Sequence, residues 1–430
     1  MDQPGDGRVR NRLWKAGGLV AAFILTLWTT NFLLPADKQF DSHMYGHDFL
    51  PFYTAGQLIR MGRADWLYDP RITRVLEHET CREAGLVIHN EYGAFLNPPF
   101  AALPAEWLAA WPYRTALAIW TVILLLCLAA SVGLLARMLP AETDWRTWGL
   151  APLLLLAALP VWQAAIHAQN TFVSLLILSA TVALWRNGRS FAAGAVAGLL
   201  LFKPQLAAVV IAVLVISRGW RAAAGAVVTA AGLLLVNLIA LPGTIGGYLH
   251  QLPLNLRAIQ MLPNYTWQRH VTFLAWWRIL LQGHVGALPS TLAYALAGVS
   301  MAAIGVILAA TVWRARNDPR RTDRVIAAAI AAGPLLMPYY MDYDLTLLSV
   351  AAVLCAGDAI RRGVDRGVLA AWIAFYVVAE FNPPIAGNTR VIPDVPMLAL
   401  LACVLIGNAR QRIADEATMP AAAQQLRAAA

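Results

Sequence analysis

The sequence predicts an all-α polytopic membrane protein with about twelve transmembrane helices. Of its 430 residues, 59% are hydrophobic and only 13% are charged, whereas about a quarter of the residues of a soluble domain are charged. Continuous apolar runs at 16–35, 116–139, 222–241 and 288–313 are long enough to cross about 30 Å of hydrocarbon as helices. The runs are continuous rather than alternating, which is the pattern of helices and not of a β-barrel.

The first apolar run is expected to be an uncleaved transmembrane helix. It follows a basic flank that includes Arg8, Arg10, Arg12 and Lys15. It is longer than the apolar core of a secretory signal peptide, which has about 7–15 residues, and no clear small-x-small cleavage site follows it.

The expected topology comes from the short basic runs between the apolar ones, because cytoplasmic loops are enriched in Lys and Arg. These runs lie at 8–15, 137–146, 186–189, 218–221, 314–324, 361–366 and 410–412. If all of them are cytoplasmic, the chain crosses the membrane an even number of times between successive runs, and both termini are cytoplasmic. Twelve spans satisfy this condition, at 16–35, 114–138, 148–163, 170–185, 191–202, 205–217, 222–241, 288–313, 325–338, 345–360, 367–381 and 394–408.

Two pairs of spans are short hairpins in this topology. Between Arg189 and Arg218 the chain must rise and return, and arms of about 12–13 residues reach only about 19 Å. The tip would be Lys203-Pro204, below the outer membrane surface. One long tilted helix is the alternative, although Pro204 would interrupt it. The preceding pair, 148–163 and 170–185, has Gln169 and Asn170 at its tip.

All substantial loops are expected on the extracytoplasmic side of a single transmembrane domain, residues 1–410. The first, 36–113, is predicted to contain interfacial helices at about 49–62 and 70–84, then an apolar stretch at 101–111 that re-enters the membrane edge. The others are 242–287, 337–344 and 380–394. Residues 411–430 are expected to form a disordered cytoplasmic tail.

Several classes of function are disfavoured by the sequence. The net charge of +9 comes mainly from the short basic runs, and no basic groove with interleaved aromatic residues indicates nucleic-acid binding. Three of the four cysteines lie in apolar runs, which favours neither a disulfide framework nor a zinc site. We find no phosphate-binding glycine loop, nucleophile elbow or metal-binding motif, so no cofactor is predicted. The sequence does not decide whether a metal ion is required.

Asp48 and Lys203 are the two leading candidates for chemistry, and each has a structural alternative. Asp48 lies just past the first apolar run, where its carboxylate could take a proton from an incoming hydroxyl; equally, it could cap a helix. Lys203 in its apolar surroundings could bind a phosphate, or its side chain could extend to the membrane surface.

Other polar residues of the expected extracytoplasmic side could bind a polyhydroxyl ligand or a phosphate. Gln169 and Asn170 could do so, or cap the following helix. Asp342, Tyr343 and Asp344 could likewise bind such a ligand or cap a helix. Arg269 and His270 could supply positive charge to a phosphate, or face lipid headgroups. Most of the sixteen tryptophans are expected to mark the membrane interfaces.

Several segments, taken in order, resemble glycosyltransferase family 87 of the GT-C superfamily. They cover residues 10–410, and their order and spacing carry more weight than any single motif. The segments are Asp48-Phe49 with Phe52-Tyr53-x-Ala55-Gly56, Gly62 with Leu67-Tyr68-Asp69-Pro70, Asn97-Pro98-Pro99-Phe100, Trp120, Gln169-Asn170, Gly194-x-x-x-Gly198 with Lys203-Pro204, and Pro338 with Tyr343-Asp344-Leu345. In three places the chain departs from the family pattern: Asn97 replaces a tyrosine of many members, Ala168 replaces the glycine before Gln169, and Tyr339 and Tyr340 stand where some members have a histidine.

The resemblance implies a GT-C-type fold and transfer of a sugar, often mannose, from a polyprenyl-phosphate donor to a glycan or glycolipid acceptor, usually with inversion. The reaction would take place on the extracytoplasmic face of a bacterial inner membrane, with Asp48 as the base. Lys203, Arg269 and His270 would bind the donor phosphate. The expected sugar- or substrate-binding residues are Tyr53, Asn97, Gln169, Asn170, Tyr339, Tyr340, Asp342 and Asp344.

Three alternatives remain at this stage. A lipid or glycan transporter or flippase would carry polar residues through the bilayer midplane and repeated halves. A non-catalytic envelope-assembly subunit would tolerate the loss of Lys203. A polymerase or ligase would use a diphosphate-linked glycan.

Overall fold

The computed structural model describes residues 45–86, 88, 93–140, 143, 155, 157–263 and 265–411, with Lys15 and short stretches between 18 and 30. These residues are helical and contain no strand, only an isolated antiparallel bridge between His270 and Met341. The expected first span, the first half of the span at 148–163 and the tail after 411 lie largely outside the described residues.

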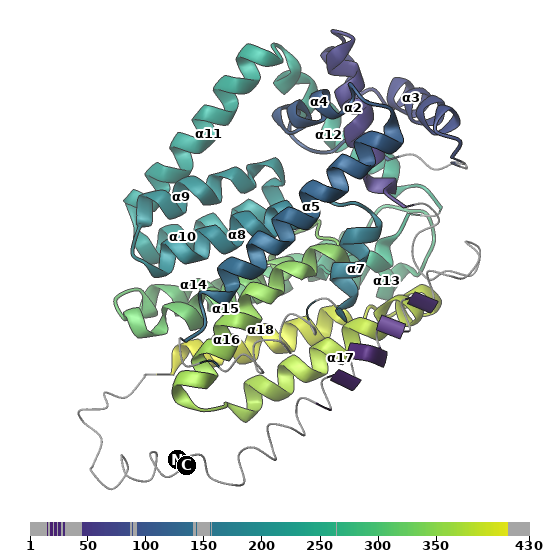
Figure 1. Ribbon diagram of the computed structural model, residues 1–430. Helices are drawn as coiled ribbons and strands as arrows, with labels where there is room; N and C mark the ends of the chain where they lie inside the picture. Colours follow the sequence, from purple (N-terminus) through teal and green to yellow (C-terminus); the bar gives the residue numbers. More distant parts are fainter. Residues whose placement is uncertain are drawn as a thin grey trace, which may run out of the picture.

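The helices correspond closely to the apolar runs (Figure 1). The α-helices are α2 (Leu50–Arg60), α3 (Pro70–Glu83), α4 (Leu103–Leu108), α5 (Tyr113–Ala136), α7 (Leu159–Ile166), α8 (Thr171–Arg186), α9 (Ser190–Gly198), α10 (Pro204–Arg218), α11 (Trp220–Ala240), α12 (Thr244–Gln260), α13 (Phe273–Gln282), α14 (Thr291–Ala315), α15 (Thr322–Ala332), α16 (Leu348–Arg362), α17 (Arg366–Asn388) and α18 (Asp394–Arg410). Short 3₁₀ helices include η2 (His47–Phe49), η4 (Pro99–Ala102), η5 (Leu199–Phe202), η6 (Trp267–Arg269) and η9 (Asp342–Leu347).

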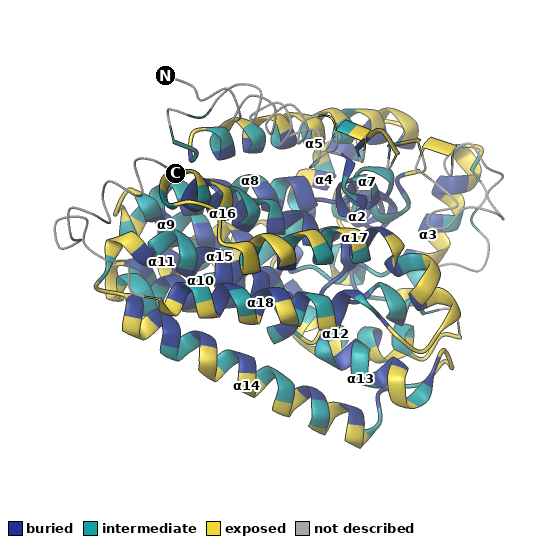
Figure 2. Cartoon of the chain, turned by 90° about the horizontal axis from the view of Figure 1, so that it is seen from below, coloured by how far each residue is buried: buried dark blue, intermediate teal, exposed yellow. Residues whose placement is uncertain are grey.

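Five of the described helical segments are long and apolar enough to cross a membrane. They are α5, α11, α14, η9 with α16, and α17. The segments Thr171–Arg186, Ser190–Phe202 and Pro204–Arg218 are apolar but shorter. Helices such as α5 and α14 turn exposed residues outward and buried residues inward (Figure 2), and the exposed side chains include Val299 and Val306. An apolar exterior over a buried interior is the arrangement of a polytopic membrane protein.

The interruption expected at Lys203-Pro204 is present. The helical segment Ser190–Phe202 ends directly before Lys203, and Pro204 is the first residue of α10. Helices α9 and α10 pack against each other and against α11 (Figure 1), so the two short arms form a hairpin rather than one long helix. Glycines allow α9 and α11 to approach closely, because a Cβ on Gly194 would lie 2.0 Å from the carbonyl oxygen of Ala222.

The arginines of the basic runs gather at one end of the helices. The guanidinium of Arg186, at the end of α8, donates to both carboxylate oxygens of Asp323, which also accepts from Arg361 at the end of α16. Arg218, at the end of α10, donates to Thr322. These contacts place at least three separate basic runs side by side.

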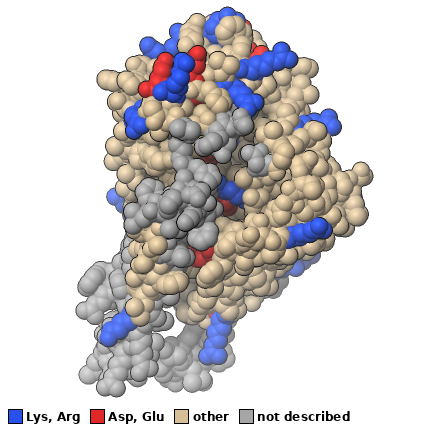
Figure 3. All heavy atoms as spheres, turned by 90° about the vertical axis from the view of Figure 1, so that its right-hand side faces the viewer, with Lys and Arg blue, Asp and Glu red and all other residues tan. Residues whose placement is uncertain are grey.

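Elements of the expected extracytoplasmic loops are also helical, and two predictions need correction. Helices α2 and α3 match the two helices expected in the first loop. However, residues 242–287 contain α12 and α13, which we did not predict, and α17 continues to Asn388, past the expected end of its span at 381. Pro383 and Pro384 lie inside α17 and do not end it. In Figure 3 charged side chains crowd the upper end, level with α2, α3 and α4 in Figure 1, and are sparse over the rest of that face.

Candidate functional site

Asp48 lies in η2, directly before α2. Gly46 begins this turn with a positive φ of 78°, and its backbone is tied to the rest of the protein on both sides. Its N–H donates to the carbonyl of Ile166, and its carbonyl accepts from the hydroxyl of Tyr113. The side chain of Asp48 caps neither η2 nor α2, so the helix-cap interpretation of this residue does not hold.

The Asp48 carboxylate meets three polar side chains. Gln169 Nε2 donates to Oδ2 at 2.7 Å, His167 Nδ1 lies 3.8 Å from the same oxygen, and His47 Nδ1 lies 3.3 Å from Oδ1. Burial alone would raise the pKa of Asp48, but the two imidazoles and the hydrogen bond from Gln169 outweigh burial and hold that pKa well below its ordinary value. About 25% of the side chain remains exposed. Asp48 is therefore an ionised carboxylate that a ligand can reach.

The turn between α7 and α8 presents two of these partners. Ala168 has a φ of 51°, and it is the sole non-glycine residue with a positive φ in the described part of the chain. This conformation is costly for alanine, and it explains why a glycine suits this position. The carbonyl of Ala168 accepts from Trp120 Nε1 at 2.9 Å. The turn is thereby fixed, with His167 and Gln169 on either side of Ala168.

Arg269 forms a bidentate ion pair with Asp342. Its Nε donates to Oδ2 at 2.9 Å and its Nη2 to Oδ1 at 3.0 Å, the geometry that binds a guanidinium most firmly. Gln163, on α7, donates to the same carboxylate at 3.0 Å. The third guanidinium nitrogen, Nη1, lies 2.9 Å from His167 Nε2, so this pair adjoins the surroundings of Asp48.

Lys203 forms a second buried ion pair, with Asp344. Its Nζ donates to Oδ1 at 3.0 Å, and the same oxygen accepts from Thr171 at 2.6 Å. Both charged side chains are more than nine-tenths buried, so Lys203 does not extend to the membrane surface. Tyr343 connects the two ion pairs, because its ring lies near both cations and its hydroxyl accepts from Gln169 at 3.0 Å.

His270, Tyr339 and Tyr340 hold η6 against the segment before η9. His270 forms the backbone bridge to Met341, its Nε2 lies 2.8 Å from the hydroxyl of Tyr265, and its ring packs edge-on against Tyr339. Burial and the neighbouring Arg269 lower the pKa of His270 to about 3. This direction of the shift favours a neutral imidazole over the expected cationic one. The hydroxyl of Tyr340 donates to the carbonyl of Asp344.

Two of the expected substrate-binding residues donate hydrogen bonds to backbone carbonyls. Tyr53 donates to the carbonyl of Trp111 at 2.8 Å and packs against Phe49. The side chain of Asn97 donates to the carbonyl of Phe202 at 2.7 Å, which attaches the first loop to the residue before Lys203. These two side chains support the site and point their polar atoms at the backbone.

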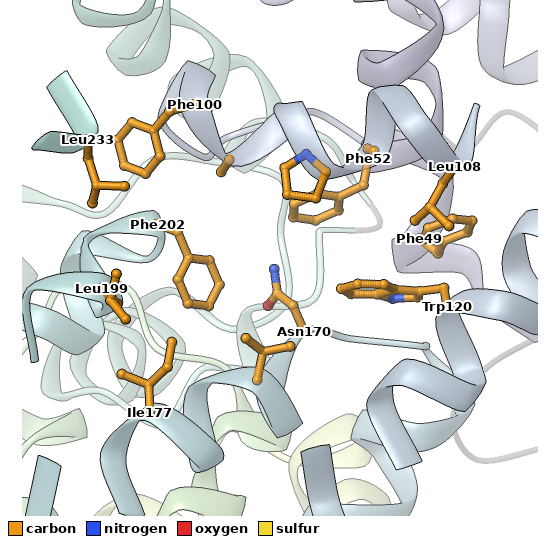
Figure 4. A pocket seen from close by; sticks show the side chains of 14 residues that line it. Phe49, Phe52, Phe100, Leu108, Trp120, Asn170, Ile177, Leu199, Phe202 and Leu233 are labelled. Atoms are coloured by element: carbon orange, nitrogen blue, oxygen red, sulfur yellow. The ribbon is translucent and has the colours of Figure 1, made fainter. Parts of the chain in front are cut away.

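An apolar pocket adjoins the polar site (Figure 4). Its volume is about 300 Å³, and Phe49, Phe202 and Asn170, the immediate chain neighbours of Asp48, Lys203 and Gln169, are among its lining residues. Aromatic side chains form much of the wall: Phe49, Phe52, Phe100, Trp120 and Phe202.

Asn170 supplies a polar group to this otherwise apolar space. Its side chain points into the pocket in Figure 4. It is 5% exposed and does not cap α8, and its Oδ1 has no hydrogen-bond partner. A buried amide oxygen without a partner is costly in a folded protein, so a ligand that donates a hydrogen bond to Asn170 would be favoured at this position. The structure thus favours the ligand-binding reading of Asn170 over the capping one.

Three polar residues of the network were not among the candidates from the sequence: Gln163, His167 and Thr171. A sequence signal for two of them existed. Gln163 and His167 are four residues apart, the spacing that puts two side chains on one face of a helix, and the helix α7 is otherwise apolar.

The assembled site can exchange a proton and can bind an anion. It contains three carboxylates: Asp342 and Asp344 each pair with an arginine or a lysine, whereas Asp48 contacts two imidazoles and Gln169. Helices α8 and α10 begin at Thr171 and Pro204, so their N-termini add partial positive charge beside the ion pairs. Within the part of the chain that the structure describes, no three His, Cys, Asp or Glu side chains are grouped to hold a metal ion.

Comparison with known proteins identifies one family. The sequence model of glycosyltransferase family 87 matches residues 95–338, which is more than half of the chain. No curated protein and no solved structure matches the chain.

Proposed function

Because the chain belongs to glycosyltransferase family 87, we propose that it transfers a sugar from a polyprenyl-phosphate donor to a hydroxyl of a glycan or glycolipid. Mannose is the favoured sugar, on the family resemblance. The observation that carries the proposal is the position of Asp48. This partly exposed carboxylate neighbours the apolar pocket and is connected through His167 to Arg269, and through Gln169 and Tyr343 to Lys203. The donor has matching parts, since a sugar is linked through a phosphate to a long apolar chain.

Asp48 would act as the general base. It takes the proton of the acceptor hydroxyl while the acceptor oxygen forms a bond to the anomeric carbon. The bond from that carbon to the phosphate oxygen breaks, and its electron pair leaves with the polyprenyl phosphate. Direct displacement of this kind inverts the anomeric centre. The hydrogen bond from Gln169 holds the carboxylate in place for the transfer.

Lys203 and Arg269 would stabilise the departing phosphate. Lys203 donates to one carboxylate oxygen, and an ammonium has three N–H groups, so it has donors to offer a phosphate without releasing Asp344. The ion pairs also explain how the fold tolerates the buried Lys203 and the partly buried Arg269, because an unpaired buried charge is strongly unfavourable. The N-termini of α8 and α10 favour an anion at the same place.

The apolar pocket would hold the first part of the polyprenyl chain. Its aromatic wall joins the base side of the site, at Phe49, to the phosphate side, at Phe202. Asn170 lies where the chain would meet the phosphate and sugar, and its amide can hydrogen-bond either one. A donor with a soluble nucleotide has no use for an apolar pocket of this kind.

We further propose a GT-C-type fold of about twelve spans in a bacterial inner membrane, with the site on the extracytoplasmic side. Helices α8 and α10 begin at the site and end at Arg186 and Arg218. The site and the arginine cluster therefore lie at opposite ends of the same helices. Since arginine-rich ends are cytoplasmic as a rule, this geometry supports an extracytoplasmic site with cytoplasmic termini.

Donor binding provides a direct test, with two variants of one helix. Leu233 on α11 lines the pocket, whereas Leu235 is 57% exposed and is not part of its lining. Polyprenyl-phosphate mannose should stabilise the purified protein against heat, and sugar nucleotides should not. Leu233→Trp should fill the pocket and weaken donor binding at least about tenfold, which corresponds to about 1.4 kcal/mol, while Leu235→Trp should bind normally. Stabilisation by a sugar nucleotide alone, or equal binding by the two variants, would overturn the proposed donor.

A further inference from the structure

His167 is almost fully buried, at 4% exposure, between the base and the Arg269–Asp342 pair. Its two ring nitrogens face different neighbours. Nε2 lies 2.9 Å from Arg269 Nη1, and Nδ1 lies 3.8 Å from Asp48 Oδ2. One imidazole therefore connects two groups that the proposed mechanism uses separately.

Arg269 determines where the proton of this imidazole resides. A guanidinium can only donate hydrogen bonds, so at the Nη1 contact Nε2 must be the acceptor and carries no proton. A neutral imidazole then has its proton on Nδ1, which faces Asp48. The orientation of Arg269 is in turn fixed by its bidentate bond to Asp342 and by Gln163, which donates to the same carboxylate.

We propose that His167 is a positioning residue for the base: Arg269 holds its proton on Nδ1, and that N–H holds the Asp48 carboxylate in the orientation needed for proton transfer. This inference rests on the proposed function of Asp48. At 3.8 Å the Nδ1 contact is longer than a hydrogen bond, and such contacts shorten when the substrates are bound. The strained turn at Ala168 keeps His167 and Gln169 on the same carboxylate oxygen.

Two substitutions separate the two nitrogens of His167. In His167→Asn the amide nitrogen takes the place of Nδ1, so the variant retains a donor for Asp48 and loses the contact with Arg269. In His167→Gln the amide reaches the place of Nε2, so the variant can accept from Arg269 and loses the donor for Asp48. We expect kcat to fall about 10- to 100-fold in His167→Gln with little change in the donor KM, and His167→Asn to retain most of kcat.

The assay for both variants is the rate of mannose transfer from polyprenyl-phosphate mannose. His250, which is exposed on α12, supplies the control His250→Asn, with expected wild-type rates. Equal loss of kcat in His167→Asn and His167→Gln would show that the imidazole only fills space, and wild-type kcat in both would show that it has no role; either result overturns the inference. If the wild-type protein transfers no sugar from this donor, the proposed function has failed instead.

A spectroscopic measurement tests the inference without activity. In protein labelled with ¹⁵N-histidine, the signals of His167 can be identified by their loss in His167→Asn. We expect a protonated Nδ1 and an unprotonated Nε2 at neutral pH, and Arg269→Gln should remove this preference. A proton on Nε2 in the wild-type protein would overturn the inference, whatever the donor proves to be.

Discussion

Substitutions in the Lys203–Asp344 pair can distinguish a structural role of Lys203 from a role in binding the donor phosphate. Replacing Lys203 by methionine keeps most of the side-chain volume but leaves Asp344 ionised and without its cation. The remaining partner of the Asp344 side chain is then Thr171, at 2.6 Å. Because Asp344 is only 2% exposed, water cannot replace the lost charge. Removal of one partner from a buried ion pair costs about 3–5 kcal/mol.

The double variant Lys203→Met with Asp344→Asn removes both charges and keeps an acceptor for Thr171. Replacement of a buried pair by neutral groups of similar volume is close to neutral for stability, so the double variant should regain all but about 1 kcal/mol. Its transferase activity should stay as low as that of Lys203→Met, because the donor phosphate has lost the same cation in both.

Unfolding by a denaturing detergent measures the first effect, and transfer from polyprenyl-phosphate mannose measures the second. Asp344→Asn alone is the matched control, since it keeps the ammonium beside the phosphate. If the double variant recovers wild-type activity together with stability, Lys203 serves the fold alone, and the role that we assign to it in binding the donor phosphate is wrong.

Two further predictions concern stability. Burial raises the pKa of Glu77 to about 8 from an ordinary value of 4.5, so the unfolded chain ionises first and stability falls by up to about 1.4 kcal/mol per pH unit as the pH rises between these values. Melting curves at pH 5.5 and 8 should show that Glu77→Gln abolishes this loss of stability, whereas the exposed Glu79→Gln should retain it. If stability falls equally with pH in the two variants, Glu77 is not the cause of the pH dependence. A Cβ on Gly225 would lie 2.0 Å from the carbonyl oxygen of Phe191, so Gly225→Ala should destabilise the protein by about 1–3 kcal/mol. The Cβ of Gly232→Ala would have open space, and equal effects of the two substitutions would show that α9 and α11 do not pack closely.

The helices could be predicted from the sequence because each apolar run is bounded by a strong signal. Arg186 and Arg218 end α8 and α10, and Pro204 begins α10. The helices of the second loop were missed because α12 carries a proline, Pro253, within an amphipathic rather than a continuous apolar run. The end of α17 was misplaced for a similar reason, since a helix in a membrane protein can continue through prolines when its neighbours satisfy the freed carbonyls.

Several residues of the candidate site could be predicted from the sequence, but the contacts between them could not. Asp48, Gln169 and Lys203 were conspicuous as polar residues beside apolar runs. The pairs that they form could not be predicted. Lys203 and Asp344, for example, are 141 positions apart, and a single sequence does not show which distant residues are in contact. Gln163 and His167 were overlooked because we did not read their four-residue spacing as one face of a helix, which here is α7 and its C-cap residue.

The central claim is that Asp48 is the base of a polyprenyl-phosphate-dependent sugar transfer, and the rate of that transfer by Asp48→Asn tests it most directly. Asparagine retains an oxygen that accepts from Gln169, so the local fold should persist, as a thermal melt can verify. The rate should fall at least about 100-fold relative to wild type, the usual contribution of a positioned base. A folded Asp48→Asn protein that transfers mannose at a rate near that of wild type would contradict the account.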